Sequence, residues 1–368
     1  MEWCNLVAMS AGYRCWVATQ TDNRVPLAKM TTLRVGGPAS EVITCPDADS
    51  LIDTVRDLDE AGIPVLLVGG GSNLVVGDDG FDGTVVRIAG TDLDWGDDQV
   101  TADAGVNWDA LVAQSVERGF GGLECLSGIP GSVGATPVQN VGAYGVEVGA
   151  LMRSVQLLDR QTGAVNWVDP GDLELAYRSS RLKRRSDEVV IRVSFRLNAD
   201  GLSQPIRYGE LARTLGVEED ERAPAADVRA AVLALRASKG MVLDPDDHDT
   251  WSVGSFFTNP IVPQEHLPTV LTRIVDELGD DARVPQFPAE GGVKMSAGWL
   301  IERAGFGRGF PGTDAPARLS TKHSLAVTNR GNARTSDIID LARQVRDGVH
   351  ARFGLWLEPE PVLVGCSL

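Results

Sequence analysis

Cysteine is scarce in this sequence and follows no pattern. The 368 residues include five cysteines, Cys4, Cys15, Cys45, Cys125 and Cys366, with no CxxC spacing. A disulfide framework uses an even set of cysteines, and a structural zinc site uses closely spaced thiol pairs, so both kinds of site are excluded. The sequence therefore predicts no metal site and a reducing, cytoplasmic location.

Basic charge and long apolar runs are also lacking. The chain has 34 Lys and Arg against 51 Asp and Glu, a net charge of −17, which excludes nucleic acid and anionic membranes as partners. A small anionic ligand can still be held by backbone N–H groups and a few cations. No stretch reaches the roughly 20 apolar residues of a membrane span. The N-terminal segment lacks the basic start of a secretory signal, and we expect residues 1–25 to form a poorly ordered extension.

The common catalytic signatures are missing as well. There is no Gly-Lys pair and hence no Walker A loop, and the four histidines are too dispersed for a zinc-protease helix. The dinucleotide fingerprint GxGxxG fails at Leu74, and neither Ser72 nor Ser255 lies in a GxSxG elbow. These absences exclude the corresponding nucleotidases, proteases and hydrolases.

Hydrophobic periodicity indicates alternating helices and strands. Helices are predicted at residues 50–61, 109–118, 227–240, about 265–278, about 296–304 and 336–352. Strands are predicted at residues 65–68, 85–88, 155–158, 165–168, 189–197, 355–357 and 362–364, with a hairpin formed by 155–158 and 165–168. Asp227 is the expected cap of its helix, and residues 243–247 are the expected domain boundary. The pattern favours an α/β or α+β fold.

Two glycine clusters are the most specific feature present. One, at residues 69–73, follows an apolar strand, and the other, at residues 127–134, leads into residues 137–145. Glycines let the backbone approach a ligand and present N–H groups to an anion such as a pyrophosphate. A dinucleotide such as FAD fits two nearly uncharged clusters better than a mononucleotide does. The alternative is a set of tight turns with no ligand.

Three polar positions stand out beyond the glycines. The Arg178 guanidinium is suited to bind a carboxylate through two parallel hydrogen bonds. Ser255 precedes two phenylalanines, and Glu360 interrupts an apolar terminal segment. Each also has an ordinary structural interpretation, respectively a solvated basic face, a turn at the edge of the core, and an exposed strand edge.

These segments together are similar to a known family. They are TTLRVGG at 31–37, LVGGGSNL at 67–74, GIPG at 128–131 with QNVGAYG at 139–145, YR at 177–178, GSFF at 254–257 with NP at 259–260, Lys294 with AGWLIE at 297–302, and LEPE at 357–360. In this order they resemble the bacterial UDP-N-acetylenolpyruvoylglucosamine reductases of peptidoglycan synthesis. The resemblance extends from about residue 27 to the C-terminus.

The resemblance implies an α+β flavoenzyme with a two-part FAD-binding region of the vanillyl-alcohol-oxidase type and a C-terminal α+β substrate-binding domain. The implied parts are subdomain 1 at residues 26–90, joined by a C-terminal strand at about 354–368, subdomain 2 at residues 91–240, and the substrate-binding domain at residues 241–353. The implied activity is the NADPH-dependent, FAD-mediated reduction of UDP-N-acetylglucosamine enolpyruvate to UDP-N-acetylmuramate for the cell wall.

The resemblance also implies roles for individual residues. Arg178 is the expected fixed cation, Glu360 a carboxyl that is protonated or linked through water, and Ser255 the proton donor. The implied FAD-binding residues are Arg34, Val68, Gly69, Gly70, Gly71, Ser72, Asn73, Leu74, Gly128, Ile129, Pro130, Gly131, Gly134, Pro137, Asn140, Gly142, Ala143, Tyr144 and Gly145. The implied substrate-binding residues are Tyr208, Lys239, Asn259, Lys294 and His323.

One residue indicates the structural type within the family, and three residues depart from the family pattern. Tyr208 matches a tyrosine on a loop that covers the substrate in the first of the family's two structural types. Thr258 stands where the family often has lysine, His323 where an amide is also seen, and Pro361 where a β-branched residue usually follows the catalytic glutamate.

Two other functions are compatible with parts of this pattern. An alcohol oxidase or dehydrogenase of the same cofactor fold would leave Ser255 and Glu360 without a role. A nucleotide-binding sensor would bind nucleotide without turning over NADPH. The absence of heptads and repeats favours a monomer.

Overall fold

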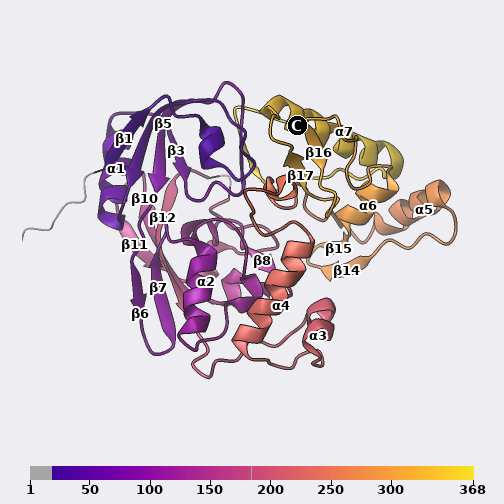
Figure 1. The fold of residues 1–368 in the computed structure, drawn as a ribbon, viewed down its shortest axis with the longest axis horizontal. Helices are drawn as coiled ribbons and strands as arrows, with labels where there is room; N and C mark the ends of the chain where they lie inside the picture. The colour runs from indigo at the N-terminus through magenta and orange to yellow at the C-terminus, as the bar shows by residue number, and fades with distance from the viewer. Residues whose placement is uncertain (1–18, 184) are drawn as a thin grey trace, which may run out of the picture.

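The computed structural model describes residues 19–183 and 185–368. Three mixed helix-and-strand regions follow one another along the chain, and the end of the chain returns to the first (Figure 1). In this described part of the chain, no helix combines the length and the apolar character needed to cross a membrane.

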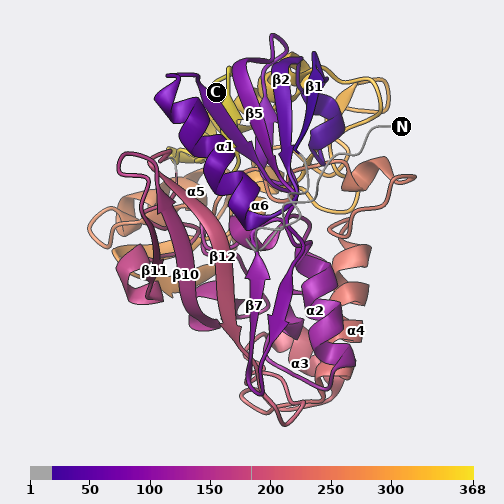
Figure 2. The ribbon, with the colours of Figure 1, turned by 90° about the vertical axis from the view of Figure 1, so that its left-hand side faces the viewer.

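The first region is a four-stranded sheet with a helix against it. The strands, in the order β1-β2-β5-β3, are β1 (Gln20–Asn23), β2 (Ala39–Cys45), β5 (Phe81–Ile88) and β3 (Val65–Val68). All neighbours are parallel except β1 and β2. Helix α1 (Ala48–Glu60) begins at Asp47, whose side chain accepts from the Ser50 N–H, and Gly62 follows its end in the left-handed region. Its apolar face packs between this sheet and β12 of the second region (Figure 2).

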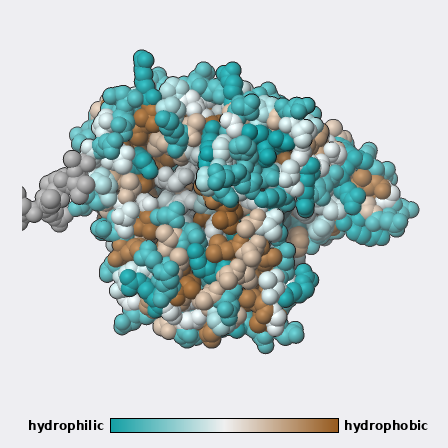
Figure 3. All heavy atoms as spheres, in the orientation of Figure 1, coloured by the Kyte–Doolittle hydropathy of each residue, from teal (hydrophilic) through white to brown (hydrophobic). Residues whose placement is uncertain are grey.

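The second region is an antiparallel sheet in the order β11-β10-β12-β7-β6. Its strands are β6 (Leu93–Trp95), β7 (Gln99–Asp103), β10 (Met152–Asp159), β11 (Val165–Val168) and β12 (Glu188–Arg196). The accompanying elements are α2 (Trp108–Glu117), α3 (Gly209–Leu215), α4 (Ala225–Ser238) and the short hairpin of β8 (Gly142–Ala143) and β9 (Val146–Glu147). Trp108 and Phe195 meet edge to face in the core between sheet and helices. Apolar residues reach the surface over α2 and α4 (Figure 3).

The third region surrounds a long helix. It holds α5 (Leu267–Leu278), α6 (Ala297–Arg303), α7 (Thr335–Phe353), the sheet of β13 (Ile261–Val262), β15 (Gly292–Met295) and β14 (Gln286–Ala289), and the pair β16 (Ala317–Leu319) and β17 (Val327–Asn329). Its core includes the side chains of Phe256, Phe257 and Phe353, all at most 2% exposed. One-turn 3-10 helices occur at Leu27–Met30, Glu124–Leu126, Val133–Ala135, Val148–Ala150, Pro170–Leu173 and His248–Thr250.

The C-terminal strand connects the third region to the first. Strand β18 (Val362–Val364) pairs in parallel with β4 (Leu74–Val76), directly after the first glycine cluster. The Asp78 carboxylate, just after β4, accepts from the N–H groups of Thr335 and Ser336 at the start of α7. Because β18 begins at Val362, Glu360 lies two residues before a strand that runs beside the end of the first glycine cluster.

Three expectations from the sequence are wrong in detail. Residues 20–23 are not a loose extension, because they form β1 against β2; the rest of the expected extension, residues 1–18, lies outside the described residues. Helix α4 begins at Ala225 after Pro224 at the N-cap position, so Asp227 lies in its first turn and does not cap it. Residues 355–357 alternate in burial but are not a strand, because no neighbouring strand pairs with them in the described structure.

Candidate active site

A cavity of about 560 Å³ lies where the three regions meet. It is lined by the first glycine cluster, part of the second, and the side chains of Arg178, Ser255 and Glu360. Its size and its mostly apolar lining with a few convergent polar groups are typical of a small-molecule or cofactor site. All three residues expected to be catalytic are therefore brought together, although they lie in different parts of the sequence.

The first glycine loop, residues 69–73, presents unpaired donors. None of its five backbone N–H groups donates to another described residue. The loop fits closely against its neighbours: a Cβ on Gly70 would lie 2.6 Å from the Gly131 Cα, and a Cβ on Gly71 would lie 1.8 Å from the Met30 carbonyl oxygen. A run of N–H groups without protein acceptors is the arrangement that binds a phosphate or pyrophosphate.

The second glycine segment lies opposite the first. Ile129, Pro130, Gly131 and Gly134 line the cavity, as do all seven predicted residues 68–74. Gly128 does not line it, and its N–H donates to the Asp109 carboxylate at 2.6 Å. Two more groups of this segment bond within the protein: the Gly134 N–H donates to the Ala104 carbonyl and the Gly131 carbonyl accepts from Trp108.

Residues 137–145, which continue this segment, line the cavity only in part. Gly142 lines the cavity, whereas Pro137, Asn140, Ala143, Tyr144 and Gly145 do not. Asn140 is 3% exposed, and its side chain bonds Glu147, the Ala176 carbonyl and the Gly149 N–H. Tyr144 and Gly145, both with positive φ, form the turn of the β8–β9 hairpin.

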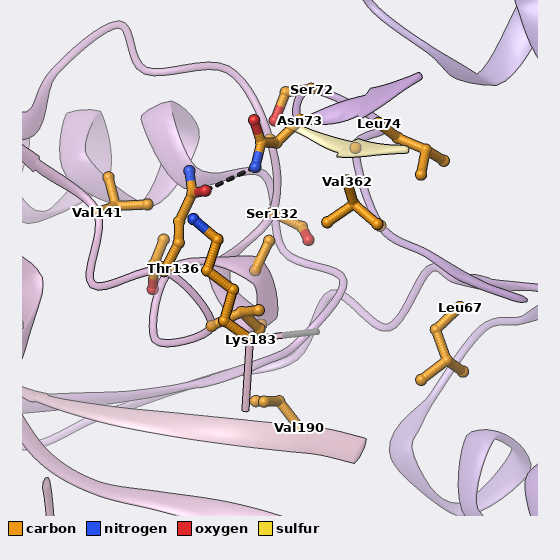
Figure 4. Close-up of a pocket in the computed structure, with 18 of the residues that line it drawn as sticks. Leu67, Ser72, Asn73, Leu74, Ser132, Thr136, Val141, Lys183, Val190 and Val362 are labelled. Carbon is orange, nitrogen blue, oxygen red and sulfur yellow. Dashed lines mark hydrogen bonds between the residues drawn. The ribbon is translucent and has the colours of Figure 1, made fainter. Parts of the chain in front are cut away.

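Asn73 joins the two glycine segments to the C-terminal strand (Figure 4). The Asn73 Nδ2 donates to Gln139 Oε1 at 2.6 Å and lies 3.4 Å from the Glu360 carbonyl oxygen. The backbone carbonyl of Asn73 accepts from the Val362 N–H. Gln139, which the residue-by-residue expectations omitted, stands within the QNVGAYG motif and is the partner that fixes Asn73.

Arg178 and Glu360 form an ion pair on the cavity wall. Arg178 Nε lies 3.2 Å from Glu360 Oε1, and another guanidinium nitrogen donates to the Gly142 carbonyl at 2.7 Å. Arg178 has φ of +53°, a strained conformation for a side chain of this size, and Lys183 Nζ donates to its carbonyl. Burial raises the pKa of the Glu360 carboxyl, opposed by the charges of Arg178 and Lys183.

Ser255 reaches the cavity from the third region. It follows Gly254, which has φ of +77°, and precedes two buried phenylalanine rings that anchor the loop in the core. The Phe256 N–H donates to Leu325, and its carbonyl accepts from the Glu360 N–H at 2.9 Å. The backbone segments that carry Ser255 and Glu360 are thus hydrogen-bonded to each other.

Arg236 is a cavity residue that the sequence interpretation missed. It lies on α4, its Nε is buried with no partner among the described residues, and burial lowers the pKa of its guanidinium. The signal was present in the sequence, because Val228, Val232 and Arg236 are spaced by four and share one helix face. Another guanidinium nitrogen donates to the Met241 carbonyl at 2.8 Å, so the Nε–H is the donor left for an anionic or carbonyl-bearing ligand.

The expected substrate residues form two groups outside this cavity. In one group, Lys239 pairs with Glu210 at 2.6 Å and Tyr208 meets Tyr144 edge to face. His323 belongs to this group: burial, assisted by the positive charge of Lys239, lowers the pKa of its imidazole to about 4.

In the other group, Tyr177 lies between Asn259 and Lys294. The Asn259 Nδ2 donates to the Tyr177 hydroxyl at 3.3 Å, and Lys294 Nζ lies 4.3 Å from the ring centroid. A second cavity of about 480 Å³ is lined by Asn259 and Tyr177 and shares Arg178 and Lys183 with the larger one.

Arg34 is a predicted cofactor residue that the structure places over an aromatic ring. It does not line the larger cavity, and its guanidinium is stacked on the Trp251 ring. In residues 19–183 and 185–368, no three His, Cys, Asp or Glu side chains gather where they could hold a metal ion.

Two family models match the chain. Residues 39–169 match an FAD binding domain, and residues 244–364 match the C-terminal domain of UDP-N-acetylenolpyruvoylglucosamine reductase. These ranges contain the two glycine clusters and the segments that carry Ser255 and Glu360.

Curated relatives and a solved structure match almost the whole chain. The UDP-N-acetylenolpyruvoylglucosamine reductases of Nocardia farcinica and Saccharopolyspora erythraea are 62% and 61% identical, covering 94% and 93% of this chain and 90% and 95% of theirs. That of Mycobacterium tuberculosis is 54% identical over 94% of this chain and 95% of its own. The crystal structure of the Thermus caldophilus reductase has a TM-score of 0.63 at 26% identity and covers 94% of this chain and 99% of that one.

Proposed function

The chain belongs to the UDP-N-acetylenolpyruvoylglucosamine reductase family, and from that premise we propose that Arg178, Ser255 and Glu360 carry its reaction. The protein is an FAD-dependent oxidoreductase that uses NADPH to reduce UDP-N-acetylglucosamine enolpyruvate to UDP-N-acetylmuramate for peptidoglycan synthesis. The observation that carries the assignment of residues is the Arg178–Glu360 pair, in one cavity with Ser255 and the unpaired N–H groups of residues 69–73.

The cavity fits a flavin dinucleotide by its donors. Residues 69–73 offer consecutive N–H groups for a pyrophosphate, and the Arg236 guanidinium offers a buried donor that lacks a protein acceptor. Residues 129–131 pack directly against residues 69–73 and line the same cavity, so the ligand would lie along the surface that the two backbone loops form together. When bound, FAD supplies the hydride that reduces the carbon–carbon double bond of the substrate.

Arg178 stabilises the charge that develops on the substrate. Hydride addition to the β-carbon of the enol ether moves negative charge onto the substrate carboxylate, and a fixed guanidinium beside that carboxylate lowers the barrier. Its position is set in advance by its bonds to Gly142 and Glu360 and by its strained backbone. Burial raises the pKa of Glu360 and so disfavours its ionised form, and the pairing with Arg178 offsets the negative charge that the carboxylate would set against the substrate.

Ser255 donates the proton that completes the reduction. Its hydroxyl lies on the wall that also carries Arg178 and Glu360, and Phe256 and Phe257 keep the base of the loop dry. A strongly basic enolate in a site screened from water can take a proton from a serine. The α-carbon receives this proton, so the double bond gains one hydride and one proton.

The remaining assignments follow the same family pattern. Tyr208, Lys239 and His323 would contact the nucleotide end of the substrate from one side, and Asn259 and Lys294 from the other. We assign residues 26–90 with the C-terminal strand and residues 91–240 to FAD binding, and residues 241–353 to the substrate. A monomeric protein of the cytoplasm is part of the same proposal.

The experiment that tests the residue roles separates the two half-reactions. In Ser255→Ala, reduction of the flavin by NADPH should proceed as in the unaltered protein, while reoxidation by the enolpyruvyl substrate should slow by about 10²–10⁴-fold, because only the second step needs the proton. Thr162→Ala is the matched control, since it removes an exposed hydroxyl from the turn between β10 and β11 that lines neither cavity. Equal slowing of both half-reactions would remove Ser255 from the role of proton donor.

A further inference from the structure

Arg34 is held in a specific place by the segment that contains it. Residues 31–35 lead from the first 3-10 helix towards β2, and Arg34 has φ of +56°, an unfavourable conformation for a long side chain. Its guanidinium carbon lies 3.6 Å from the Trp251 ring centroid, and no carboxylate of the described residues pairs with it. Arg34 does not line the larger cavity. The contact that the structure shows for its guanidinium is the one with the Trp251 ring.

Trp251 opens the loop that carries Ser255, and the start of this loop is fixed from two sides. The Thr32 hydroxyl donates to the Ser252 carbonyl at 2.6 Å, and the Asn329 N–H donates to the Trp251 carbonyl at 3.0 Å. The Asn329 side chain, 2% exposed, also donates to the carbonyls of Leu33 and Arg34 at 3.1 and 3.2 Å. One asparagine on β17 thus bonds both the Arg34 segment and the Trp251 segment.

We propose that Arg34 is a positioning residue for Ser255, acting through its stacking on Trp251, and that it does not hold the cofactor. The inference rests on the proposed role of Ser255 as proton donor. It adds which residue sets the position of the Ser255 hydroxyl. Ser252 follows Trp251 directly, its carbonyl accepts from Thr32, and its side-chain oxygen accepts from the Gly254 N–H at 3.1 Å, so the segment from Trp251 to Gly254 is one hydrogen-bonded turn that leads straight into Ser255. A displacement of Trp251 therefore moves this turn and the Ser255 hydroxyl with it.

Planarity is what distinguishes this role from a charge effect. A guanidinium stacks flat on an indole, whereas an ammonium is a compact, strongly hydrated charge that does not. If Arg34 stacked on Trp251 is what positions the loop, Arg34→Lys should fail nearly as badly as Arg34→Met. If Arg34 instead neutralised a phosphate of the cofactor, lysine would largely restore function.

The test measures four properties of Arg34→Met, Arg34→Lys and Trp251→Leu: flavin content, melting temperature, the rate of flavin reduction by NADPH, and the rate of reoxidation by the enolpyruvyl substrate. A displacement of the proton donor by about 1 Å costs on the order of 10²-fold. We expect reoxidation to slow by roughly 10- to 100-fold with a larger solvent isotope effect, while flavin content and the reduction rate stay unchanged.

Two further variants make the result specific. Arg24→Met is the matched control, because Arg24 also has a left-handed backbone, with φ of +52°, but is exposed and stacks on no described ring. It should leave both half-reactions unchanged. The double variant Arg34→Met/Trp251→Leu should be no slower than the worse single variant, because both changes break one contact. Trp251→Leu tests the stack from its other side if an Arg34 variant does not fold.

The outcomes separate this proposal from the proposed function. Loss of flavin in Arg34→Met, equal slowing of both half-reactions, unchanged reoxidation, or restoration by Arg34→Lys would each overturn the positioning role. If the unaltered protein were reduced by NADPH but not reoxidised by the substrate, the proposed function would fail instead.

Discussion

Substitution of Gly70 by alanine tests how the two glycine loops hold the cofactor. The added Cβ would lie 2.6 Å from the Gly131 Cα and 2.9 Å from the Gly131 carbonyl carbon. Non-bonded carbons are normally separated by about 3.5–4.0 Å, so the two loops must separate by roughly 1 Å. Gly70 does not have a positive φ, and backbone strain therefore adds nothing to this steric effect.

The cost for binding follows from the donors that move. A charge-assisted hydrogen bond contributes about 1.5–3 kcal/mol, and the N–H groups of residues 69–73 have no protein acceptor to hold them if the ligand is lost. Losing one or two of these bonds weakens FAD binding by about 3 kcal/mol, on the order of 10²-fold. The assay is titration of apoprotein with FAD, followed by flavin fluorescence and by the absorbance ratio of the purified holoprotein.

Gly171→Ala is the matched control for this substitution. A Cβ on Gly171 meets no heavy atom within 4 Å, and its φ is ordinary, so FAD affinity should not change. Full flavin occupancy and unchanged affinity in Gly70→Ala would refute the placement of the dinucleotide against these two packed loops.

Three other substitutions have distinct expected results. Arg178→Ala should slow reoxidation by about 10²–10³-fold with flavin content unchanged, whereas recovery of an apoprotein would mean that Arg178 holds the cofactor. Because burial raises the pKa of Glu360, its carboxyl stabilises the fold at acidic pH, and this contribution is lost as pH rises above about 4.3. Glu360→Gln should flatten that loss in urea denaturation across pH, and an unchanged profile would contradict it. For His323, whose pKa burial lowers to about 4, stability should fall by about 3 kcal/mol as pH drops from about 6.5 to about 4; His323→Gln should abolish this fall, and persistence of the fall would assign it to other groups.

Within the described residues, local signals in the sequence were sufficient for every α-helix except α3 and for six of the eighteen strands, namely β3, β5, β10, β11, β12 and β18. The hairpin at residues 155–168 is confirmed, with Val155 opposite Val168, because its strands alternate around a Gly163 turn. Helix α1 is confirmed, but it begins at Ala48 and not at residue 50, because Asp47 caps its start. The α+β fold with an FAD-binding part and the family's C-terminal domain is confirmed as well.

The errors arise where tertiary partners decide the outcome. Leu355 and Leu357 are buried and Trp356 is exposed, as a strand would predict, yet no neighbouring strand bonds them in the described structure. Residues 20–23 are polar and exposed, so no hydrophobic pattern marks them, and only the edge of β2 makes them a strand.

The site was predictable as a set of motifs and less so as geometry. The family pattern named Arg178, Ser255 and Glu360, but not that Glu360 is tied through its backbone to the loop of Ser255. A helix-face count would have found Arg236. The position of Arg34 depends on a contact with Trp251, 217 positions later in the chain, which no local pattern encodes.

The measurement that tests the account most directly is the visible spectrum of the purified protein through one anaerobic cycle. NADPH should bleach the flavin band, and UDP-N-acetylglucosamine enolpyruvate, added next, should restore it with formation of UDP-N-acetylmuramate. A protein that takes up no FAD would contradict the cofactor and every role built around it, and a band that bleaches but does not return with this substrate would contradict the reaction.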